Sequence, residues 1–388
     1  MGRLTTRDSR FEWSGGITMP SVPGRIVAWL VYQSRCWQGV ARLCQLVDRR
    51  PLLAVFTFHR VVLDPPPHTH LQGYERGQSL TSFTAQLEAI GRIFDIVSLS
   101  EFSDLLSGRI LQGRRPVALL TFDDADSLHG RIAFPVLFER GWPGVSFVPT
   151  GFIETNRRFY HLRLTNICNH LSASDWTRLL DDQMPVEVKS IIEAHLDTDM
   201  SDRQLFRQQL IPVFHTMNVD TRDRLLDAWE RLVPGYTLGI ECASWAEIKS
   251  WQRQGIDIGS HSVNHHRLAL LEPGAIEFEL ITSRQILLQQ VGGGVASVSY
   301  PEGSYTEAVP ALAQEAGYEI GFTTTTGFVM APIRDSRRYL IPRISIWGDS
   351  PYLASYSIGR LMLRHLAESV KRRWRKGPSS GSKLSDIH

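Results

Sequence analysis

A short apolar segment that ends in two adjacent carboxylates constrains this chain more than any other feature. Residues Val117 to Phe122 are apolar and prone to β structure, and they lead directly into Asp123 and Asp124. Such a run predicts a buried strand. Neighbouring carboxylates repel each other, so the pair needs a shared proton, strong hydrogen-bond donors or a cation. The segment therefore predicts a strand that carries a chemically active acid pair at its carboxyl end.

A second short strand is followed by histidines that suit a metal ion. Residues 256–259 are β-like and lead into His261 and His265, which are four residues apart and can converge on one side of a turn. With Asp124 they would form a set of two imidazoles and one carboxylate that leaves positions open for water and substrate. Such a set suits zinc, and also iron(II), cobalt or manganese. Zinc lowers the pKa of its water from about 15.7 to about 7, and Asp123 is then free to act as a base.

The two motifs together, T-F-D-D at residues 121–124 and H-S-x-x-H at 261–265, resemble those of the polysaccharide deacetylase family, also called the NodB-homology or carbohydrate esterase 4 family. The resemblance implies an α/β fold: a distorted (β/α)7-type barrel, similar to a TIM barrel, here with a helical insertion and helical flanks. It also implies a metal-dependent enzyme that removes acetyl groups from N-acetylated sugars. In that reading Asp123 is the catalytic base, and Asp124, His261 and His265 bind the metal.

The first β-like run also carries a candidate site residue at its end. Residues 52–58 precede His59 and Arg60, and the segment F-T-F-H-R-V resembles the start of many exopolysaccharide-type family members. If the strand ends there, His59 lies on the rim where barrel enzymes place their chemistry. A structural histidine bonded to a backbone carbonyl is the alternative.

The third family motif is matched in part. The strand at residues 295–300 leads into Pro301 and then Tyr305, which resembles a Y-P-x-G variant of the motif. By that resemblance Pro301 and Tyr305 border the substrate, and the backbone N–H of Tyr305 stabilises the oxyanion. A tyrosine that only packs in a turn is the alternative. The arginine expected near Ser299 or Tyr300 is absent, although it usually positions the catalytic base.

A later segment offers a replacement for that arginine. The run L-I-P-R-I-S-I at residues 340–346 resembles a segment near the end of many family members, and its Arg343 is the candidate to orient Asp123. A surface ion pair is the alternative. The family's last motif supplies a histidine that protonates the leaving amine, but residues 344–347 contain none. Either another group, with His59 the best candidate, donates that proton, or the enzyme is slow or inactive.

Length and composition predict one catalytic domain with an insertion and flanks. The chain has 388 residues and 43% apolar content, which suffices for a sizeable core. We expect a tail and amphipathic helix over 1–50, the barrel over 51–350 and a basic C-terminal helix and tail over 351–388. Residues 152–240 show no strand pattern and predict helices over 175–180, 186–196, 202–217 and 221–232. We expect this insertion to cap the site, form a dimer surface or add stability.

The flanking segments suggest contact with a surface. An apolar stripe from Ile26 through Trp37, Val40, Leu43 and Val47 either lies on a membrane or packs on the outside of the barrel. The basic cluster around Trp374 suits anionic lipid headgroups. The net charge is +2, so no nucleic-acid partner is expected. Four scattered cysteines and the absence of a signal-peptide pattern predict a reducing, cytoplasmic location, with membrane association as an option.

Three functions follow from these motifs. The first is a metal-dependent hydrolase that removes N-acetyl groups from amino sugars of a polysaccharide, oligosaccharide or lipid-linked glycan. The second is a catalytically weak or inactive glycan-binding protein of the same fold, which the missing arginine and histidine favour. The third is a hydrolase of a non-sugar amide or formamide, since the family resemblance also covers such substrates.

Overall fold

The computed structural model of the chain describes residues 36–64, 76–109, 115–181, 184–196, 202–238, 240–333, 335–346 and 351–375. Three predicted features lie outside these ranges: the N-terminal tail with the start of the amphipathic stripe at Ile26, the polar residues that follow Arg375, and Trp347 of the last motif.

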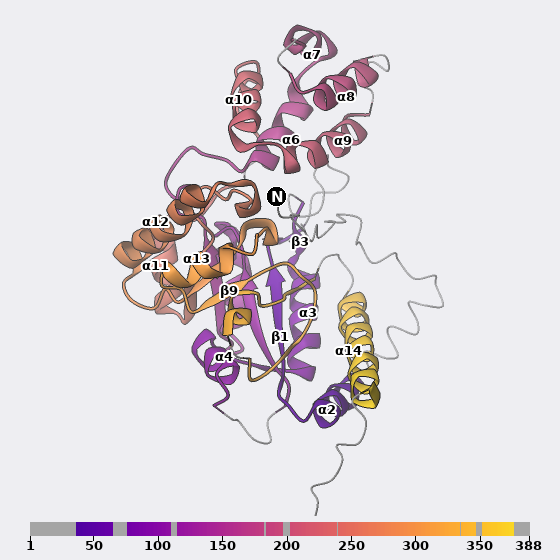
Figure 1. Cartoon of the computed structure of the whole chain (residues 1–388). Coiled ribbons are helices and arrows are strands. Elements are labelled where there is room, and N and C mark those ends of the chain that lie inside the picture. Colours follow the sequence, from indigo (N-terminus) through magenta and orange to yellow (C-terminus); the bar gives the residue numbers. More distant parts are fainter. Residues whose placement is uncertain are drawn as a thin grey trace, which may run out of the picture.

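A curled sheet of mainly parallel strands forms the centre of the molecule (Figure 1). The strand order is β10-β1-β5-β6-β7-β8-β9, and only β10 runs antiparallel to its neighbour. Strands β1, β5 and β6 are buried along their whole length, as expected for parallel strands covered on both faces. The strands are β1 (Leu52–Phe58), β5 (Val117–Phe122), β6 (Gly144–Val148), β7 (Ile256–Ser260), β8 (Ser297–Ser299), β9 (Ile320–Phe322) and β10 (Val329–Met330).

Alternate residues of each strand supply two separate cores. In β1, Leu53 and Val55 belong to one apolar cluster, whereas Ala54 and Phe56 belong to another. The clusters differ because successive side chains of a strand point to opposite faces. One cluster includes side chains from most of the helices that cover the sheet, whereas the other joins side chains of β1, β5, β6 and β9.

Backbone hydrogen bonds bring the last strand of the sheet back towards the first. The amide of Thr323 donates to the carbonyl of Ile341, and the amide of Ile341 donates to the carbonyl of Gly321. Just beyond Ile341, β11 (Ile344–Ser345) pairs in parallel with β1. The sheet therefore curls into the distorted barrel that the sequence predicted.

Helices alternate with the strands and cover the outside of the sheet. A capping box at Ser244 and Glu247 begins α11 (Trp245–Arg253), with the Ser244 hydroxyl accepting from the Glu247 amide and the Glu247 carboxylate accepting from the Ser244 amide. A second capping box pairs Ser98 with Glu101. These helices are α3 (Leu80–Ile93), α4 (Leu99–Leu106), α5 (Phe134–Phe138), α11 (Trp245–Arg253), α12 (Pro273–Val291) and α13 (Val309–Glu315).

The chain between β6 and α11 forms the predicted helical insertion, which lies beyond one end of the sheet (Figure 1). It has its own core, in which Trp176, Phe206, Phe214 and Trp229 are buried together. The sequence prediction missed its first helix. The helices are α6 (Tyr160–His170), α7 (Ala173–Leu179), α8 (Val186–Leu196), α9 (Arg203–Thr216) and α10 (Val219–Glu230).

The two flanking helices, α2 (Cys36–Asp48) and α14 (Pro351–Arg375), lie side by side next to α3 (Figure 1). The face of α2 that packs coincides with the predicted stripe in part: Trp37 is buried and Val40 packs against the core, whereas Leu43 is 46% exposed and Ala41 and Cys44 are buried instead. A side chain at Gly359 of α14 would collide with the Trp37 ring. Small residues therefore line this contact because the two helices approach closely.

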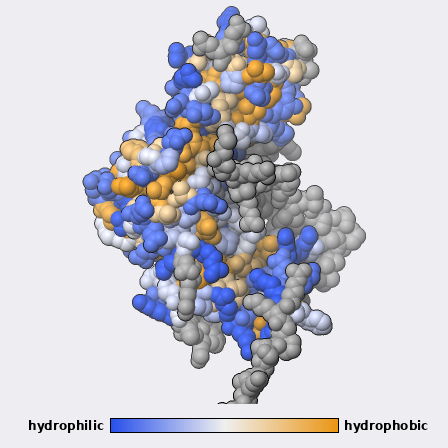
Figure 2. Space-filling model, in the orientation of Figure 1, coloured by the Kyte–Doolittle hydropathy of each residue, from blue (hydrophilic) through white to orange (hydrophobic). Residues whose placement is uncertain are grey.

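The outer surface mixes hydrophilic and hydrophobic residues (Figure 2). Apolar residues gather on the α12 side of the face shown, where Phe278 and Ile281 are exposed. Within the part of the chain that the structure describes, no helix combines the length and apolar character needed to cross a bilayer. All four cysteines are free thiols.

Candidate active site

Three side chains predicted as metal ligands converge at the carboxyl edge of the sheet. Asp124 follows β5, and His261 and His265 follow β7; only β6 separates these strands. One ligand atom from each residue lies within 4.8 Å of the others, and all three residues are buried. The Asp124 Oδ1 atom is 3.2 Å from His265 Nε2 and 3.6 Å from His261 Nε2. The spacing of the two motifs therefore produces the predicted cluster.

The backbone around these ligands adopts unusual conformations. Asp124, Ala125, Ser262 and His265 all have positive φ angles, between 48° and 71°. Such conformations cost of the order of 1–3 kcal/mol for each non-glycine residue and collect at functional sites. Local hydrogen bonds hold them in place: the His265 amide donates to Ser262 Oγ at 3.0 Å, and the carbonyl of Ala125 accepts from the backbone of Ala243 at 2.8 Å.

Glu279 of α12 fixes the loop that carries the histidines. One of its oxygens accepts from the amides of Val263 and Asn264, both at 2.8 Å, and the other accepts from the Asn264 side chain at 2.6 Å. The carboxylate is only 2% exposed. Sequence reasoning missed this residue, because a helical glutamate that caps a distant loop has no local motif.

The two histidines have different electrostatic environments. Burial lowers the pKa of His261 to about 4, and the Asp123 carboxylate only partly opposes this. Its Nδ1 is 2.8 Å from the carbonyl of Ser299, which leaves Nε2 facing Asp124. His261 is thus neutral near pH 7, the form that a metal ligand needs. Burial also acts to lower the pKa of His265, but the adjacent Asp124 carboxylate outweighs it and raises that pKa.

Asp123 is held by the arginine that the sequence suggested. Arg343 donates Nη1 to Oδ1 and Nη2 to Oδ2, both at 2.8 Å, and its Nε donates to the carbonyl of Thr323. Burial acts to raise the pKa of Asp123, but the charge and hydrogen bonds of Arg343, together with the nearby His261 and His59, hold this pKa below its usual value. Arg343 is 1% exposed, so the pair is not the surface ion pair considered as its alternative. Its catalytic role stays a prediction.

His59 lies beside Asp123, as expected from the pairing of β1 with β5. Its Nε2 is 3.9 Å from Asp123 Oδ2, and burial lowers the pKa of its imidazole. The backbone carbonyl of His59 is 2.8 Å from Nε2 of buried His129, a residue that sequence reasoning did not single out. The assignment of His59 as a proton donor stays a prediction.

The segment after β8 borders the same edge. Pro301 is buried and begins a 3-10 turn, η3 (Pro301–Gly303), whereas Tyr305 is 39% exposed. The Tyr305 ring centroid is 6.3 Å from that of Tyr300. The proposed contacts of Pro301 and Tyr305 with the substrate and the oxyanion stay predictions.

Glu302, within this turn, connects the barrel to the helical insertion. It has a φ of 55° and accepts a hydrogen bond at 3.0 Å from the hydroxyl of Tyr160 on α6. Its other oxygen is 2.9 Å from His215 Nδ1 of α9 and 3.4 Å from Arg267 Nε. Burial acts to raise the pKa of Glu302, but the hydrogen bond and charge of His215, together with His265 and Arg267, lower this pKa to about 2. No sequence motif predicted this contact.

A polar cavity of about 380 Å³ opens between the insertion and the metal ligands. Its walls include His265 and Asn264 from the barrel, Arg163 from α6, and Arg222 and Asp227 from α10. Cavities of roughly 300–1,000 Å³ are typical of small-molecule sites. Charged and amide groups around this space suit a hydroxyl-rich ligand next to His265.

The parallel barrel, the Asp-His-His cluster and the acid beside it define a hydrolase-type site at the carboxyl edge of the strands. The profile of the polysaccharide deacetylase family matches residues 111–321, more than half of the chain. The chain belongs to this family, which confirms the family and the class of enzyme that the motifs predicted.

The chain is also similar to individual proteins. YxkH of Bacillus subtilis (strain 168) is 29% identical over 113 residues, a match that covers 29% of this chain and only 38% of that relative. The deacetylase PplD of Streptococcus pyogenes, solved in complex with acetate, is similar in fold, with a TM-score of 0.52 at 17% identity over 81% of this chain and 99% of PplD. BC0361, a polysaccharide deacetylase from Bacillus cereus, gives a TM-score of 0.50 at 13% identity over 80% of this chain and 69% of that protein.

Proposed function

We propose that this protein is a metal-dependent deacetylase that removes N-acetyl groups from amino sugars of a polysaccharide, an oligosaccharide or a lipid-linked glycan. One observation carries the proposal: Asp124, His261 and His265 converge, while Asp123 stands beside them in a bidentate pair with Arg343. A metal-ligand set with a separate ionised acid is what hydrolysis of an amide by activated water requires.

The donor set fits a divalent cation, with zinc as the expected metal and cobalt, manganese or iron as alternatives. Asp124 Oδ1 is buried and accepts no hydrogen bond from the described residues, although it faces both imidazoles. A cation between the three groups would satisfy this atom. When bound, the metal supplies Lewis acidity that polarises a carbonyl and acidifies water.

Asp123 is the base in this mechanism. Since Arg343 keeps its carboxylate ionised, Asp123 can accept the proton of the attacking water as the water adds to the acetyl carbon. The same bidentate contact fixes the direction of both carboxylate oxygens. The backbone N–H of Tyr305 is assigned to the oxyanion that develops on the acetyl oxygen.

Departure of the amino sugar requires a proton on nitrogen. His59 is assigned to this step because its Nε2 lies 3.9 Å from Asp123, the group that has just been protonated. Burial lowers the pKa of His59, so a proton that it receives is readily passed on. The products are acetate and a free amine.

Acetate release tests the proposal. Purified protein would be incubated with a chitooligosaccharide and with a lipid-linked N-acetylhexosamine, with and without added zinc, and acetate would be measured. We expect release that stops after chelation and returns with metal. Retained metal and glycan binding without acetate would favour the non-catalytic alternative, and release of formate or ring opening from a non-sugar amide would favour the third function.

Two further proposals concern the location of the protein in the cell and its contact with a membrane. We propose a cytoplasmic location, and we propose contact of the basic C-terminal helix with a membrane surface. The second is supported by the run of exposed cations before Trp374, whose side chain is 85% exposed.

A further inference from the structure

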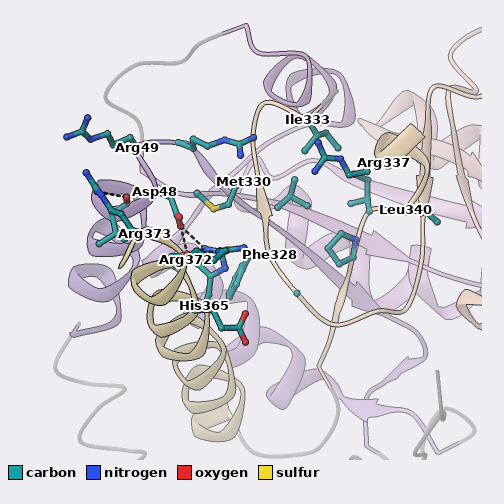
Figure 3. A pocket seen from close by; sticks show the side chains of 18 residues that line it. Asp48, Arg49, Phe328, Met330, Ile333, Arg337, Leu340, His365, Arg372 and Arg373 are labelled. Atoms are coloured by element: carbon teal, nitrogen blue, oxygen red, sulfur yellow. Dashed lines mark hydrogen bonds and ion pairs between the residues drawn. The ribbon is translucent and has the colours of Figure 1, made fainter. Parts of the chain in front are cut away.

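A second cavity lies at the opposite end of the barrel from the candidate active site. It has a volume of about 900 Å³ and is bordered by the ends of α2 and α14, by β10 and by the segment around residues 337–342 (Figure 3). Arg50, in its wall, precedes β1, whereas His59 of the active site follows β1. A strand of seven residues at about 3.3 Å per residue separates the two sites by roughly 20 Å.

Five arginines make this cavity cationic. Arg49 and Arg50 follow α2, Arg337 lies in the 3-10 turn η4, and Arg372 and Arg373 lie near the end of α14. Among the described residues, none of the five forms an ion pair with a carboxylate. Neutral groups orient several of them: Arg373 donates to a backbone carbonyl of α2 at 2.9 Å, and Arg372 donates to a serine hydroxyl at 2.8 Å.

The two carboxylates in the wall are engaged with other groups. Asp48 lies 2.9 Å from His365 Nε2 and accepts from Ser369 Oγ at 3.0 Å. Glu368 pairs with Arg364, 3.2 Å away, outside the cavity. The arginine charges therefore remain available to a ligand.

The floor between these arginines is apolar. Phe328 and Met330 lie in the middle of the cavity (Figure 3). Arg49, which follows α2, and Arg373 of α14 lie on one side of them, and Arg337 lies across from them, next to Ile333 and Leu340. Guanidinium groups match phosphate oxygens in a bidentate geometry, whereas aromatic and aliphatic side chains match hydrocarbon. The cavity is therefore complementary to a ligand that carries both.

We propose that this cavity binds a phosphate-bearing amphiphile. Its phosphate lies at Arg372 and Arg373, and its hydrocarbon covers Phe328 and Met330 in the direction of Ile333 and Leu340. The volume falls within the usual range for small-ligand sites and accommodates a headgroup with part of a chain. The ligand is either a phospholipid drawn from a membrane surface or a soluble lipid phosphate, and both sources share this chemistry.

Binding of three probes to the full-length chain tests the proposal and separates the two sources. The probes are phosphatidylcholine vesicles with and without phosphatidylglycerol, a short-chain phosphatidic acid below its micelle concentration, and inorganic phosphate. We expect binding of the short-chain lipid, with at least about tenfold weaker binding of inorganic phosphate, which lacks the apolar contacts. Additional binding of the phosphatidylglycerol vesicles assigns a membrane lipid, and its absence assigns a soluble amphiphile.

Matched variants show whether the cavity is the site. Arg372→Gln and Arg373→Gln should each weaken binding of the short-chain lipid about fivefold at constant salt. Arg360→Gln, at an exposed position of α14 outside the cavity wall, should leave it unchanged. Chelation of the metal should have no effect, which separates this site from the proposed deacetylase activity.

Three results would overturn the proposal. The first is no binding of the short-chain lipid by the unmodified chain. The second is equal affinity for inorganic phosphate, which would leave the apolar floor without a role. The third is an equal loss in Arg360→Gln and Arg372→Gln, which would reduce the effect to general attraction between charges.

Discussion

Two buried acids on the same edge of the barrel are held by partners from different parts of the chain. Asp123 is fixed by Arg343, a group of the barrel itself. Glu302 is fixed by Tyr160 and His215, which belong to the helical insertion. The first arrangement is internal to the catalytic fold, whereas the second exists only while the insertion is docked. Chemistry and access are therefore supported by separate parts of the chain.

This difference predicts that variants of the two regions will affect function in different ways. Changes at the barrel acids should alter metal content or turnover, since these groups stand at the reacting atoms of the proposed mechanism. Changes at the insertion contact should alter how substrate is bound, since α6 and α10 line the cavity beside His265. Variants of the two regions should thus fall into two kinetic classes.

Asp124→Ala should have the largest effect. Loss of a residue that hydrogen-bonds a metal ligand lowers metal affinity or activity by about 10–100-fold, and loss of the ligand itself should lower both by more. We expect metal content of the purified protein, measured by plasma mass spectrometry, to fall to background, together with acetate release. Full metal occupancy in this variant would show that another group holds the ion.

Asp123→Asn should separate the two barrel acids from each other. The amide has nearly the same shape but cannot accept the proton of water, and loss of a general base lowers turnover by about 10²–10⁴-fold. Metal content should stay equal to that of the unmodified protein, because Asp123 is not in the ligand set. Turnover that survives in this variant would remove Asp123 as the base.

Arg343→Met should change the pH dependence of the reaction. Without the guanidinium, burial dominates and raises the pKa of Asp123, so the acidic limb of the rate profile should move to higher pH. Removal of one partner of a buried pair also destabilises the fold by about 3–5 kcal/mol, measurable by urea unfolding.

A lysine at the same position is the control for this variant. Arg343→Lys keeps one charge but loses the bidentate geometry, so its acidic limb should lie between those of the unmodified protein and Arg343→Met. An acidic limb that does not move in either variant would show that Arg343 has no electrostatic role at Asp123.

The sequence predicted the barrel part of the site because its signals are local. Asp123 and Asp124 directly follow a fully buried strand, β5, and His261 and His265 follow β7, so parallel pairing through β6 brings them to one edge. Arg343 was found by its motif, and the structure adds the contact that the motif could not contain. Glu279 and Glu302 were missed because their partners are distant in sequence and follow no periodic pattern.

Helix α6 was missed for a different physical reason. Its buried face contains Thr165 and Asn166, which interrupt the apolar periodicity that identifies a helix. Both are satisfied in the fold: Arg207 donates to the Thr165 hydroxyl at 2.8 Å, and the Asn166 side chain bonds the backbone at Gly235 and Thr237. A polar network whose hydrogen bonds join residues distant in sequence leaves no periodic pattern in the sequence. The exposure of Leu43 in the predicted stripe of α2 was missed for a similar reason, since contacts with another helix, such as that between Gly359 and Trp37, help to decide which residues are buried.

Tyr160→Phe should have the smallest effect and the most diagnostic one. It removes the hydroxyl that donates to Glu302, a hydrogen bond to a charged acceptor that contributes about 1.5–3 kcal/mol. Because this bond joins α6 to the rim beside the cavity, we expect KM for a chitooligosaccharide to rise about tenfold while kcat and metal content stay within about twofold. Tyr356→Phe, on α14 away from the rim, is the matched control and should change neither constant. A fall in kcat at constant KM would place Tyr160 with the barrel acids and would end the separation between chemistry and access, because the insertion would then act on the reacting groups themselves.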